Sequence, residues 1–408
     1  MFLLKYKFIK DGGIATPQGF KVGVAKSGIK YQDRYDLAFI VSQSSAVAAG
    51  VFTTNKFCAA PVLVSKKHLM ECQEFRGFVI NSGCANACTG EEGYSDALKM
   101  TEEAAKLVGC SSEELLVAST GVIGMQLPMD RIIKGIKVAG SDMSNDKGHL
   151  AAQAIMTTDT VSKEVAVEIE IDKKKILLGA MAKGSGMIHP NMATMLGFVT
   201  TDVAISKECL QKALVMANKD SFNMLTVDGD TSTNDTLLVI ANGQAGNTFI
   251  EDENSEDFKN FAKTLKEVCI TLTKMIAHDG EGATKFLEVR VINSPSEETA
   301  KKAARSIVGS NLVKTAIFGK DANWGRVVCA LGYSGAEFEP NLVDVYLGEL
   351  LVAQKGRGLN FDEDLAMKVL EKDEVVITVD LNLGDYKGTA WGCDLTYDYV
   401  SINAEYRS

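Results

Sequence analysis

Apolar residues recur along this chain at two spacings, which predict a mixture of helices and strands. Between Ser95 and Gly109 they return every three or four residues, so we expect a helix that Ser95 caps and Gly109 ends. Ser111 and Glu114 have the spacing of a capping box. A longer stripe over residues 258–275 stops before Gly280 and predicts a helix packed on the core.

Strict alternation of polar and apolar residues marks other segments as strands. Residues 164–171 alternate, pass through Asp172 and three lysines, and return along residues 176–182. This pattern predicts a hairpin that leads into the glycine-containing segment 183–202, so that this segment leaves the edge of a sheet.

Further elements follow in the second half of the chain. Ser294-Pro295 with Glu297 predicts the start of a helix. Residues 374–383 and 387–393 read as strands, and Gly384-Asp385 between them predicts a two-residue hairpin turn.

The segment 183–202 reads KGSGMIHPNMATMLGFVTTD, and here we place the chemistry. Gly184 and Gly186 permit backbone angles closed to other residues, and Pro190 fixes its own φ. Residues 195–199 predict a buried strand that begins directly after Thr194. A hydroxyl at such a junction is held rigidly.

Composition narrows the class of protein. The chain has 408 residues, of which 46% are hydrophobic, enough for two cores or one extended layered core. Its 53 carboxylates exceed its 43 lysines and arginines, for a net charge of -10, which argues against a nucleic-acid-binding surface.

Neither a secretion signal nor a membrane span is expected. Lysines interrupt the apolar residues at the start of the chain. The longest apolar candidate, Leu37–Phe52, carries polar residues 42–45 in its middle and falls short of the roughly 20 apolar residues that a spanning helix needs. We therefore expect a cytoplasmic protein without membrane contact.

The nine cysteines read as reduced thiols because their number is odd and no secretion signal precedes them. Cys84 and Cys88 are a close pair, but no second Cys or His pair has zinc-finger spacing. We expect both to pack in the core and expect no metal site.

Eight short motifs run through the chain beside the segment around Thr194. They are GGIATPQGF (12–20), NSGCANACTG (81–90), STGVIG (119–124), MTTDT (156–160), DGDTSTND (228–235), DGEGATKF (279–286), GKDANWGR (319–326) and NAEYRS (403–408).

With these motifs in this order, the whole chain resembles the ornithine acetyltransferase family, also called glutamate N-acetyltransferases. The resemblance implies a layered α/β fold of αββα type and self-cleavage between Ala193 and Thr194. The products would be an α chain of residues 1–193 and a β chain of residues 194–408, intertwined in one folded body. It also implies a heterotetramer of two α and two β fragments.

Cleavage would supply the base that a threonine nucleophile needs. A threonine hydroxyl reacts poorly unless a base lies beside it. The α-amino group that cleavage creates on Thr194 has an unperturbed pKa of about 7.7 to 8.0 and can be that base.

By the same resemblance, the enzyme moves an acetyl group from N2-acetyl-L-ornithine to L-glutamate through an acetyl ester on Thr194. Thr120 and Gly121 match the family's oxyanion-hole pair. The family's substrate-binding positions correspond to Thr157, Lys183, Thr194, Glu281, Asn403 and Ser408.

Several details stay open. Ser408 stands where family members usually end in threonine, and the alignment does not separate Thr157 from Thr158. The resemblance implies no cofactor, but family members differ in whether acetyl-CoA also serves as acetyl donor, and no residue decides this.

Three other readings compete with acetyl transfer. An N-terminal-nucleophile aminopeptidase would share self-cleavage but would pass the acyl group to water. A nucleotide-binding protein would need a G-x-x-x-x-G-K-[ST] or G-x-G-x-x-G motif, which the sequence lacks. A non-enzymatic acidic scaffold would not need Thr194, Thr120, Gly121, Lys183 and Glu281 together.

Overall fold

The computed structural model describes residues 6–189 and 195–405, which form two compact units. Unit 1 contains residues 6–184, 195–223 and 231–272. Unit 2 contains residues 185–189, 224–230 and 273–405. Unit 1 therefore combines residues from both sides of position 194.

Unit 1 is built on one long strand, β3 (Leu37–Phe52), that belongs to two groups of strands. Its first half pairs with two neighbouring strands and its second half with a third, so the sheet continues through it. The first group contains β2 (Phe20–Ala25), β4 (Phe75–Asn81) and β5 (Leu115–Ser119). The second group contains β1 (Lys7–Phe8), β6 (Lys163–Ile171), β7 (Lys174–Lys183), β8 (Leu196–Thr201) and β10 (Thr236–Ala241).

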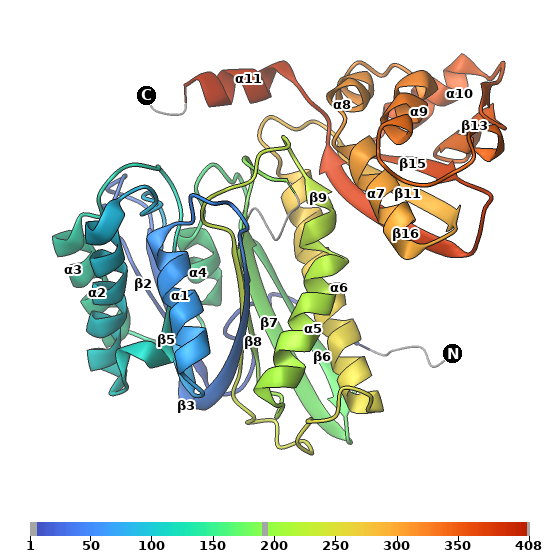
Figure 1. Ribbon diagram of the computed structural model, residues 1–408. Helices are drawn as coiled ribbons and strands as arrows, with labels where there is room; N and C mark the ends of the chain where they lie inside the picture. Colours follow the sequence, from blue (N-terminus) through green and yellow to red (C-terminus); the bar gives the residue numbers. More distant parts are fainter. Residues whose placement is uncertain (1–5, 190–194, 406–408) are drawn as a thin grey trace. The chain divides into compact units, whose positions relative to one another are not determined.

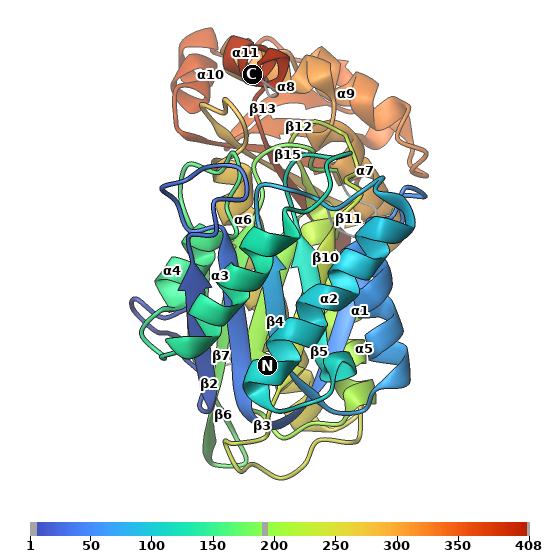
Figure 2. The ribbon, with the colours of Figure 1, turned by 90° about the vertical axis from the view of Figure 1, so that its left-hand side faces the viewer.

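Helices cover the outer sides of these two groups (Figure 1). On the first group lie α1 (Ala60–Glu71), α2 (Gly90–Val108) and α3 (Met129–Ser141), as Figure 2 shows. On the second lie α5 (Lys207–Lys219) and α6 (Glu256–His278). The short α4 (Gly148–Ala154) contributes alanines to the core between the two groups.

The two groups of strands pack face to face. Phe78 on β4 and Phe198 on β8 have ring centroids 5.4 Å apart, and both are fully buried. The surrounding core draws its apolar side chains from both groups. Unit 1 is thus a helix–sheet–sheet–helix sandwich, and the αββα architecture expected from the sequence is confirmed.

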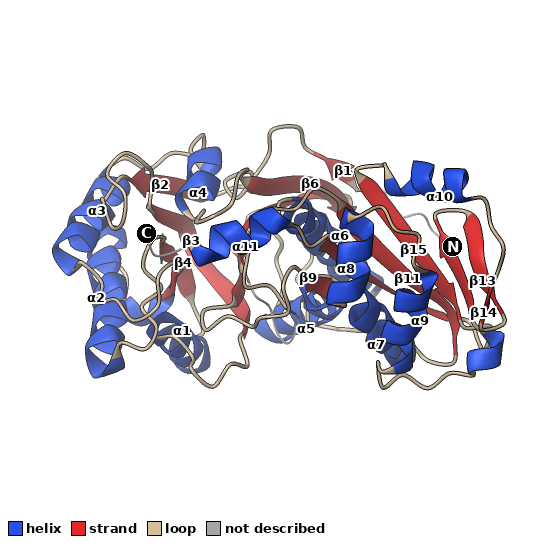
Figure 3. Cartoon of the chain, turned by 90° about the horizontal axis from the view of Figure 1, so that it is seen from above, coloured by secondary structure: helices blue, strands red, loops and turns tan. Residues whose placement is uncertain are grey.

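Unit 2 contains a second sheet with its own helices, of which α7 packs against β11 (Figure 3). In sheet order its strands are β14 (Arg357–Gly358), β13 (Leu350–Gln354), β12 (Asp344–Leu347), β15 (Glu374–Asp380), β11 (Phe286–Ser294), β16 (Tyr386–Cys393) and β9 (Leu225–Thr226). Its helices are α7 (Glu297–Val308), α8 (Asn311–Phe318), α9 (Trp324–Gly332), α10 (Glu363–Leu370) and α11 (Tyr397–Ala404).

The hairpin predicted before the glycine segment is confirmed. β6 and β7 pair antiparallel, and Asp172 and Lys173 make the turn with positive φ angles. However, β7 also pairs with β8 and is an interior strand, so the glycine segment does not leave a sheet edge. Alternation along a strand does not reveal whether a third strand lies beside it.

The second predicted hairpin is wrong. β15 and β16 both form, but β11 lies between them and pairs with each. The turn at Gly384-Asp385 therefore joins strands that are not neighbours. The helix expected after Ser294 is α7, although its N-terminal cap is Ser296, whose side chain accepts from Thr299 N–H.

The predicted helices are largely confirmed. α2 ends where expected, with Gly109 in the left-handed conformation, but it begins at Gly90, five residues before the expected cap at Ser95. The capping box at Ser111 and Glu114 opens a single 3₁₀ turn. The stripe over residues 258–275 lies on α6.

Two other expectations concern cysteines and membranes. Cys84 is buried as predicted, but Cys88 is exposed and has a positive φ, so its predicted core packing is wrong. None of the helices in the described parts of the chain has both the length and the apolar content needed to cross a bilayer.

A close approach between β2 and α3 gives a test of the packing in unit 1. A Cβ atom on Gly23 would lie 1.9 Å from the carbonyl oxygen of Ala139. We expect Gly23→Ala to lower the free energy of unfolding by about 1 to 3 kcal/mol through overpacking, measured by urea denaturation. Gly332→Ala, where a Cβ meets no atom within 4 Å, is the control and should change stability far less. Equal losses would contradict this packing.

Candidate active site

The strands of the second group end together at the point where the sequence places the chemistry. Lys183 at the end of β7 pairs with Leu196 at the start of β8, and Leu196 pairs with Thr236 at the start of β10. Thr236 in turn pairs with Phe52 at the end of β3. Four strand ends therefore lie side by side at Leu196, close in sequence to Thr194.

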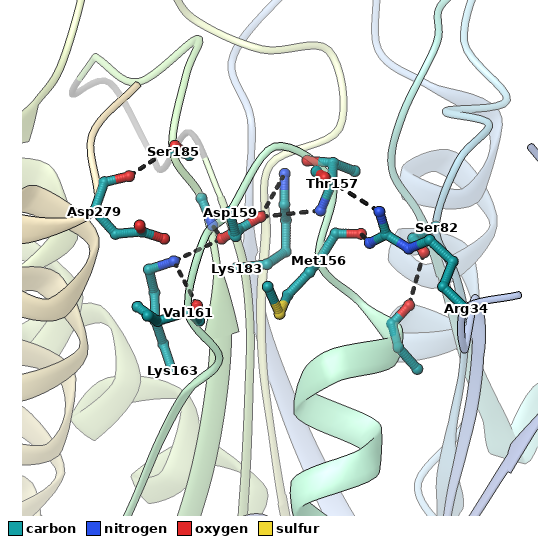
Figure 4. A network of polar contacts seen from close by, with 12 residues as sticks. Arg34, Ser82, Met156, Thr157, Asp159, Val161, Lys163, Lys183, Ser185 and Asp279 are labelled. Carbon is teal, nitrogen blue, oxygen red and sulfur yellow. Dashed lines mark hydrogen bonds and ion pairs between the residues drawn. The ribbon is translucent and has the colours of Figure 1, made fainter. Parts of the chain in front are cut away.

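A buried carboxylate organises this end of the sheet (Figure 4). Asp159 Oδ1 lies 2.7 Å from Lys163 Nζ and accepts a 2.7 Å hydrogen bond from Gly184 N–H. Its Oδ2 lies 4.0 Å from Lys183 Nζ and accepts a 3.0 Å hydrogen bond from Thr157 N–H. One carboxylate thus connects the start of β6 and the end of β7 with the first glycine of the glycine segment.

Electrostatics keep this carboxyl ionised. Burial by itself would raise the pKa of Asp159, but the charges of Lys183 and Lys163 and the hydrogen bonds outweigh it and lower the pKa to about 2. The side chain of Asp159 is fully buried, and that of Lys163 nearly so. The cluster is therefore a desolvated ion network rather than a surface salt bridge.

The predicted residue Thr157 belongs to the same network. The guanidinium group of Arg34 donates to the carbonyl oxygen of Met156 at 2.5 Å and to that of Thr157 at 3.4 Å. Ser82 Oγ donates at 2.7 Å to the carbonyl oxygen of Ala154, the last residue of α4. Side chains from two other segments therefore hold the end of α4 and the loop that follows it.

The predicted pair Thr120 and Gly121 forms a tight turn after β5. Thr120 is nearly buried and its N–H donates to Asn81 O at 3.0 Å. Gly121 has a φ of 132°, and a Cβ atom there would lie 2.3 Å from the backbone of Gly83. Only glycine fits this position, which explains the residue type in the STGVIG motif.

A residue without a predicted role joins this turn to the strand ends. Asn234 Nδ2 donates to Ser119 O at 2.8 Å and to Ala85 O at 2.6 Å. Two residues later, Thr236 N–H donates to Met195 O at 3.0 Å. The turn that carries Thr120 and the beginning of β8 are therefore linked through residues 234–236.

Asp235, between these two, is a second buried carboxyl. Burial raises its pKa well above the usual value, against the opposing effects of Ser232, Thr53, the Lys183 charge and the Met195 N–H. Among the described residues, its Oδ2 has no hydrogen-bond partner. The pKa values of Asp159 and Asp235 are thus shifted in opposite directions, because only Asp159 is closely paired with lysines.

In unit 2, the predicted residues Glu281 and Asn403 are in contact. Asn403 Nδ2, on α11, donates to Glu281 Oε2 at 2.8 Å. Glu281 is buried, and its N–H donates to Ser185 O at 2.9 Å. A Cβ atom on Gly186 would lie 2.2 Å from Glu281 Oε2, so glycine is required for this approach.

Residues 185–188 of the glycine segment are also anchored within unit 2. Asp228 accepts from Met187 N–H at 2.6 Å and from Ile188 N–H at 2.9 Å. Val227 N–H donates to Ile188 O at 2.8 Å, and Ser185 Oγ donates to Asp279 O at 2.7 Å. Met187 adopts a positive φ within these contacts.

Three of the predicted site residues, Ala193, Thr194 and Ser408, lie outside the described residues. In unit 1 the structure brings Thr157 and Lys183 together through Asp159, and in unit 2 it brings Glu281 and Asn403 together. Asp159, Asn234 and Asp228 were missed as site residues, although each lies within or beside a motif quoted above. Within residues 6–189 and 195–405, no group of three or more His, Cys, Asp or Glu side chains is placed to hold a metal ion.

In unit 1, the layered αββα fold and the polar groups at its strand ends together define the class of enzyme. The model of the ArgJ family matches residues 21–408. The chain belongs to the ArgJ family, which confirms the resemblance seen in its motifs.

Individual relatives agree with this assignment. The chain is 53% identical over 407 residues to "Arginine biosynthesis bifunctional protein ArgJ 1" of Clostridium acetobutylicum, covering 98% of this chain and 99% of that protein. It is 53% identical over 399 residues to the ArgJ protein of Symbiobacterium thermophilum, covering 97% and 99%. A crystal structure of the Bacillus halodurans protein has 50% identity and a TM-score of 0.50, covering 52% of this chain and 99% of that chain.

The Asp159 network predicts a pH-dependent stability. The pKa of Asp159 is about 2 when folded, below its usual 3.8, so its contribution is complete above pH 4 and is lost as the pH falls toward 2. This contribution amounts to about 2 kcal/mol. Asp159→Asn should cost about 3 to 5 kcal/mol at pH 7, because two lysines lose this buried partner.

Urea denaturation at several pH values tests this, with exposed Asp33→Asn as the matched control. The difference between wild type and Asp159→Asn should shrink between pH 4 and pH 2. A difference that stays constant over this range would show that the carboxylate charge does not hold the network.

Proposed function

We propose that this chain is an acetyltransferase of arginine biosynthesis that moves the acetyl group of N2-acetyl-L-ornithine to L-glutamate. The products are L-ornithine and N-acetyl-L-glutamate. The observation that carries this proposal is family membership over nearly the whole chain, at about half identity to proteins named for arginine biosynthesis. A hydrolytic aminopeptidase, the alternative reading, is not favoured by these relatives.

Maturation precedes catalysis in this proposal. Thr194 Oγ attacks the carbonyl carbon of Ala193, and its nitrogen leaves as a free amine, which gives an ester between residues 193 and 194. Water then hydrolyses the ester. The products are residues 1–193 with a new carboxylate and residues 194–408 with a free α-amino group on Thr194.

Contacts on both sides of the cut support this step. Gly184 is held by Asp159, and Met195 is held by Thr236, so the chain is fixed before and after the segment that must react. The solved Bacillus halodurans chain aligns over nearly its whole length with 52% of this chain, about the length of one fragment.

Acetyl transfer then uses the new amine as base. It takes the proton of Thr194 Oγ while the oxygen attacks the acetyl carbonyl of N2-acetylornithine. The C–N bond breaks, ornithine leaves with a proton on its amine, and the acetyl group stays as an ester on Thr194. The amine of glutamate attacks this ester in the second half of a ping-pong cycle and restores the hydroxyl.

Both tetrahedral intermediates carry an oxyanion, to which we assign the Thr120 hydroxyl and the Gly121 N–H as donors. The turn is suited to this role because it is tightly packed and needs no rearrangement. Its rigidity follows from the bond to Asn81 and from the backbone contact at Gly121.

The remaining predicted residues are assigned to the charged groups of the substrates. Lys183 would pair with a substrate carboxylate, and Glu281 would receive the ornithine ammonium. Asn403 holds one oxygen of Glu281, and we assign the other oxygen to the ammonium. Thr157 and Ser408 complete the proposed set, and no metal ion takes part.

We also propose a second activity, acetylation of glutamate with acetyl-CoA as donor. The word "bifunctional" in the relatives' names supports it. We further propose that two α and two β fragments assemble and that each α fragment is intertwined with a β fragment in one folded body. The proposed location is the cytoplasm. No contact with nucleic acid or membrane is part of it.

If the chain cleaves itself, the purified protein should consist of two fragments instead of one chain. Wild type should give two fragments, residues 1–193 and 194–408, by intact-mass analysis under denaturing conditions. Thr194→Ala should leave one uncut chain because the attacking oxygen is gone. The exposed Thr248→Ala is the control and should be cut like wild type. Cleavage of Thr194→Ala at the same bond would contradict the mechanism.

The covalent intermediate predicts a mass change. Wild type incubated with N2-acetylornithine alone should gain one acetyl group on the fragment that begins at Thr194, because no acceptor removes it. Addition of glutamate should return the fragment to its original mass and yield N-acetylglutamate. Transfer at full rate without any acetylated fragment after rapid quenching would exclude the ping-pong route.

A further inference from the structure

Asn234 lies in the loop before β10 and has no role in the mechanism above. It is 5% exposed, and both the nitrogen and the oxygen of its side-chain amide are hydrogen-bonded. Nδ2 donates both protons, to Ser119 O at 2.8 Å and to Ala85 O at 2.6 Å. Oδ1 accepts from Thr233 Oγ1.

The two acceptors flank a bridged pair of backbone segments. Ser119 directly precedes Thr120, and Ala85 directly follows Cys84. Cys84 forms backbone bridges with Thr120 and with Val122, on either side of Gly121. The Asn234 amide therefore binds both of the backbone segments that meet at Thr120 and Gly121, the two proposed oxyanion donors.

Thr236, the first residue of β10 and the next but one after Asn234, also holds the residue just before β8. Thr236 N–H donates to Met195 O at 3.0 Å, and Thr236 Oγ1 donates to the carbonyl oxygen of Asn234 at 2.8 Å. The residues from 234 to 236 thus bind the Thr120 turn at one end and the beginning of β8 at the other. A buried amide side chain that donates two hydrogen bonds resists displacement, because a shift would leave its amide protons unpaired.

We infer that Asn234 is a positioning residue for acetyl transfer, which sets the place of the Thr120–Gly121 donors relative to the start of β8, the strand that follows position 194 in the sequence. The inference rests on the proposed acetyl transfer. Oxyanion donors act only within about 2.7 to 3.1 Å of the developing charge, so a small displacement of the turn weakens transition-state binding more than substrate binding.

The test is Asn234→Asp, which keeps the shape of the side chain but replaces the donating amide by an oxygen. Two carbonyl oxygens would then face a carboxyl group instead of N–H donors. We expect kcat for transfer from N2-acetylornithine to glutamate to fall about 30- to 100-fold, with KM for N2-acetylornithine changed less than about threefold. Rates are referred to the amount of folded, cleaved protein.

Asn247→Asp is the matched control. Asn247 is equally buried, and its Nδ2 also donates to two carbonyl oxygens, those of Ala204 and Thr248. It should lose stability to a similar degree but keep the wild-type kcat. An equal fall of kcat in both variants would mean that the effect is one of stability alone and would overturn the inference.

A double-mutant cycle with Thr120→Ala separates positioning from an independent effect. If Asn234 acts through the Thr120 turn, Asn234→Asp should lower kcat several-fold less in the Thr120→Ala background than in wild type, because only the Gly121 N–H remains to be displaced. Effects that multiply in full would overturn the inference, as would a wild-type kcat in Asn234→Asp.

If Asn234→Asp does not fold, Thr233→Val is the second variant that tests the inference. It removes only the hydroxyl that donates to Asn234 Oδ1 and should lower kcat about 3- to 10-fold at unchanged KM. An unchanged kcat in this variant would contradict the inference.

Failure of the proposed function and failure of this inference give different results. A wild-type protein without glutamate-dependent transfer would overturn the proposed function and this inference with it. Normal wild-type turnover with an unaffected Asn234→Asp would overturn the inference alone.

Discussion

The buried carboxylate of Asp159 is the constraint on which this end of unit 1 depends. A desolvated charge is tolerated only when its partners and hydrogen bonds compensate for the lost water. Here the partners are Lys163 on β6 and Lys183 on β7, and the backbone donors are Thr157 and Gly184. Because each of them satisfies the same two oxygens, moving one disturbs the others. Lys183 and the first glycine of the glycine segment therefore keep fixed positions.

The layered fold supplies the second half of this arrangement. Two groups of strands pack face to face around Phe78 and Phe198, and loops that follow or precede these strands carry the polar groups. Rigid strands with functional loops are a common way to place reacting groups accurately. The Asn234 amide bonds to the last residue of β5 and to the loop after β4, and it comes from the loop before β10. It thus spans the two sheet groups with one side chain, and this explains why an amide with two donors suits the position.

Local sequence patterns predicted the elements of this fold better than their pairing. The β6–β7 hairpin, the helix α6 and the strand after Thr194 follow from alternation and helical spacing, which depend on neighbouring residues. The interior position of β7 and the separation of β15 from β16 do not, because β8 and β11 come from elsewhere in the chain. The start of α2 at Gly90 likewise escaped the pattern, since its first turn has no apolar stripe.

The sequence by itself determined the family, the layered fold class and the position of the proposed nucleophile, because motifs with fixed residue types carry that information. It also singled out Thr120, Gly121, Lys183, Glu281 and Asn403. Only the tertiary structure showed what holds them: Asp159 between two lysines, Asn403 on Glu281, and Asn234 bonded to residues 115 and 149 positions away. Such contacts are set by how distant strands come together, and hydrogen-bond partners far apart in sequence leave no local pattern from which they could be predicted.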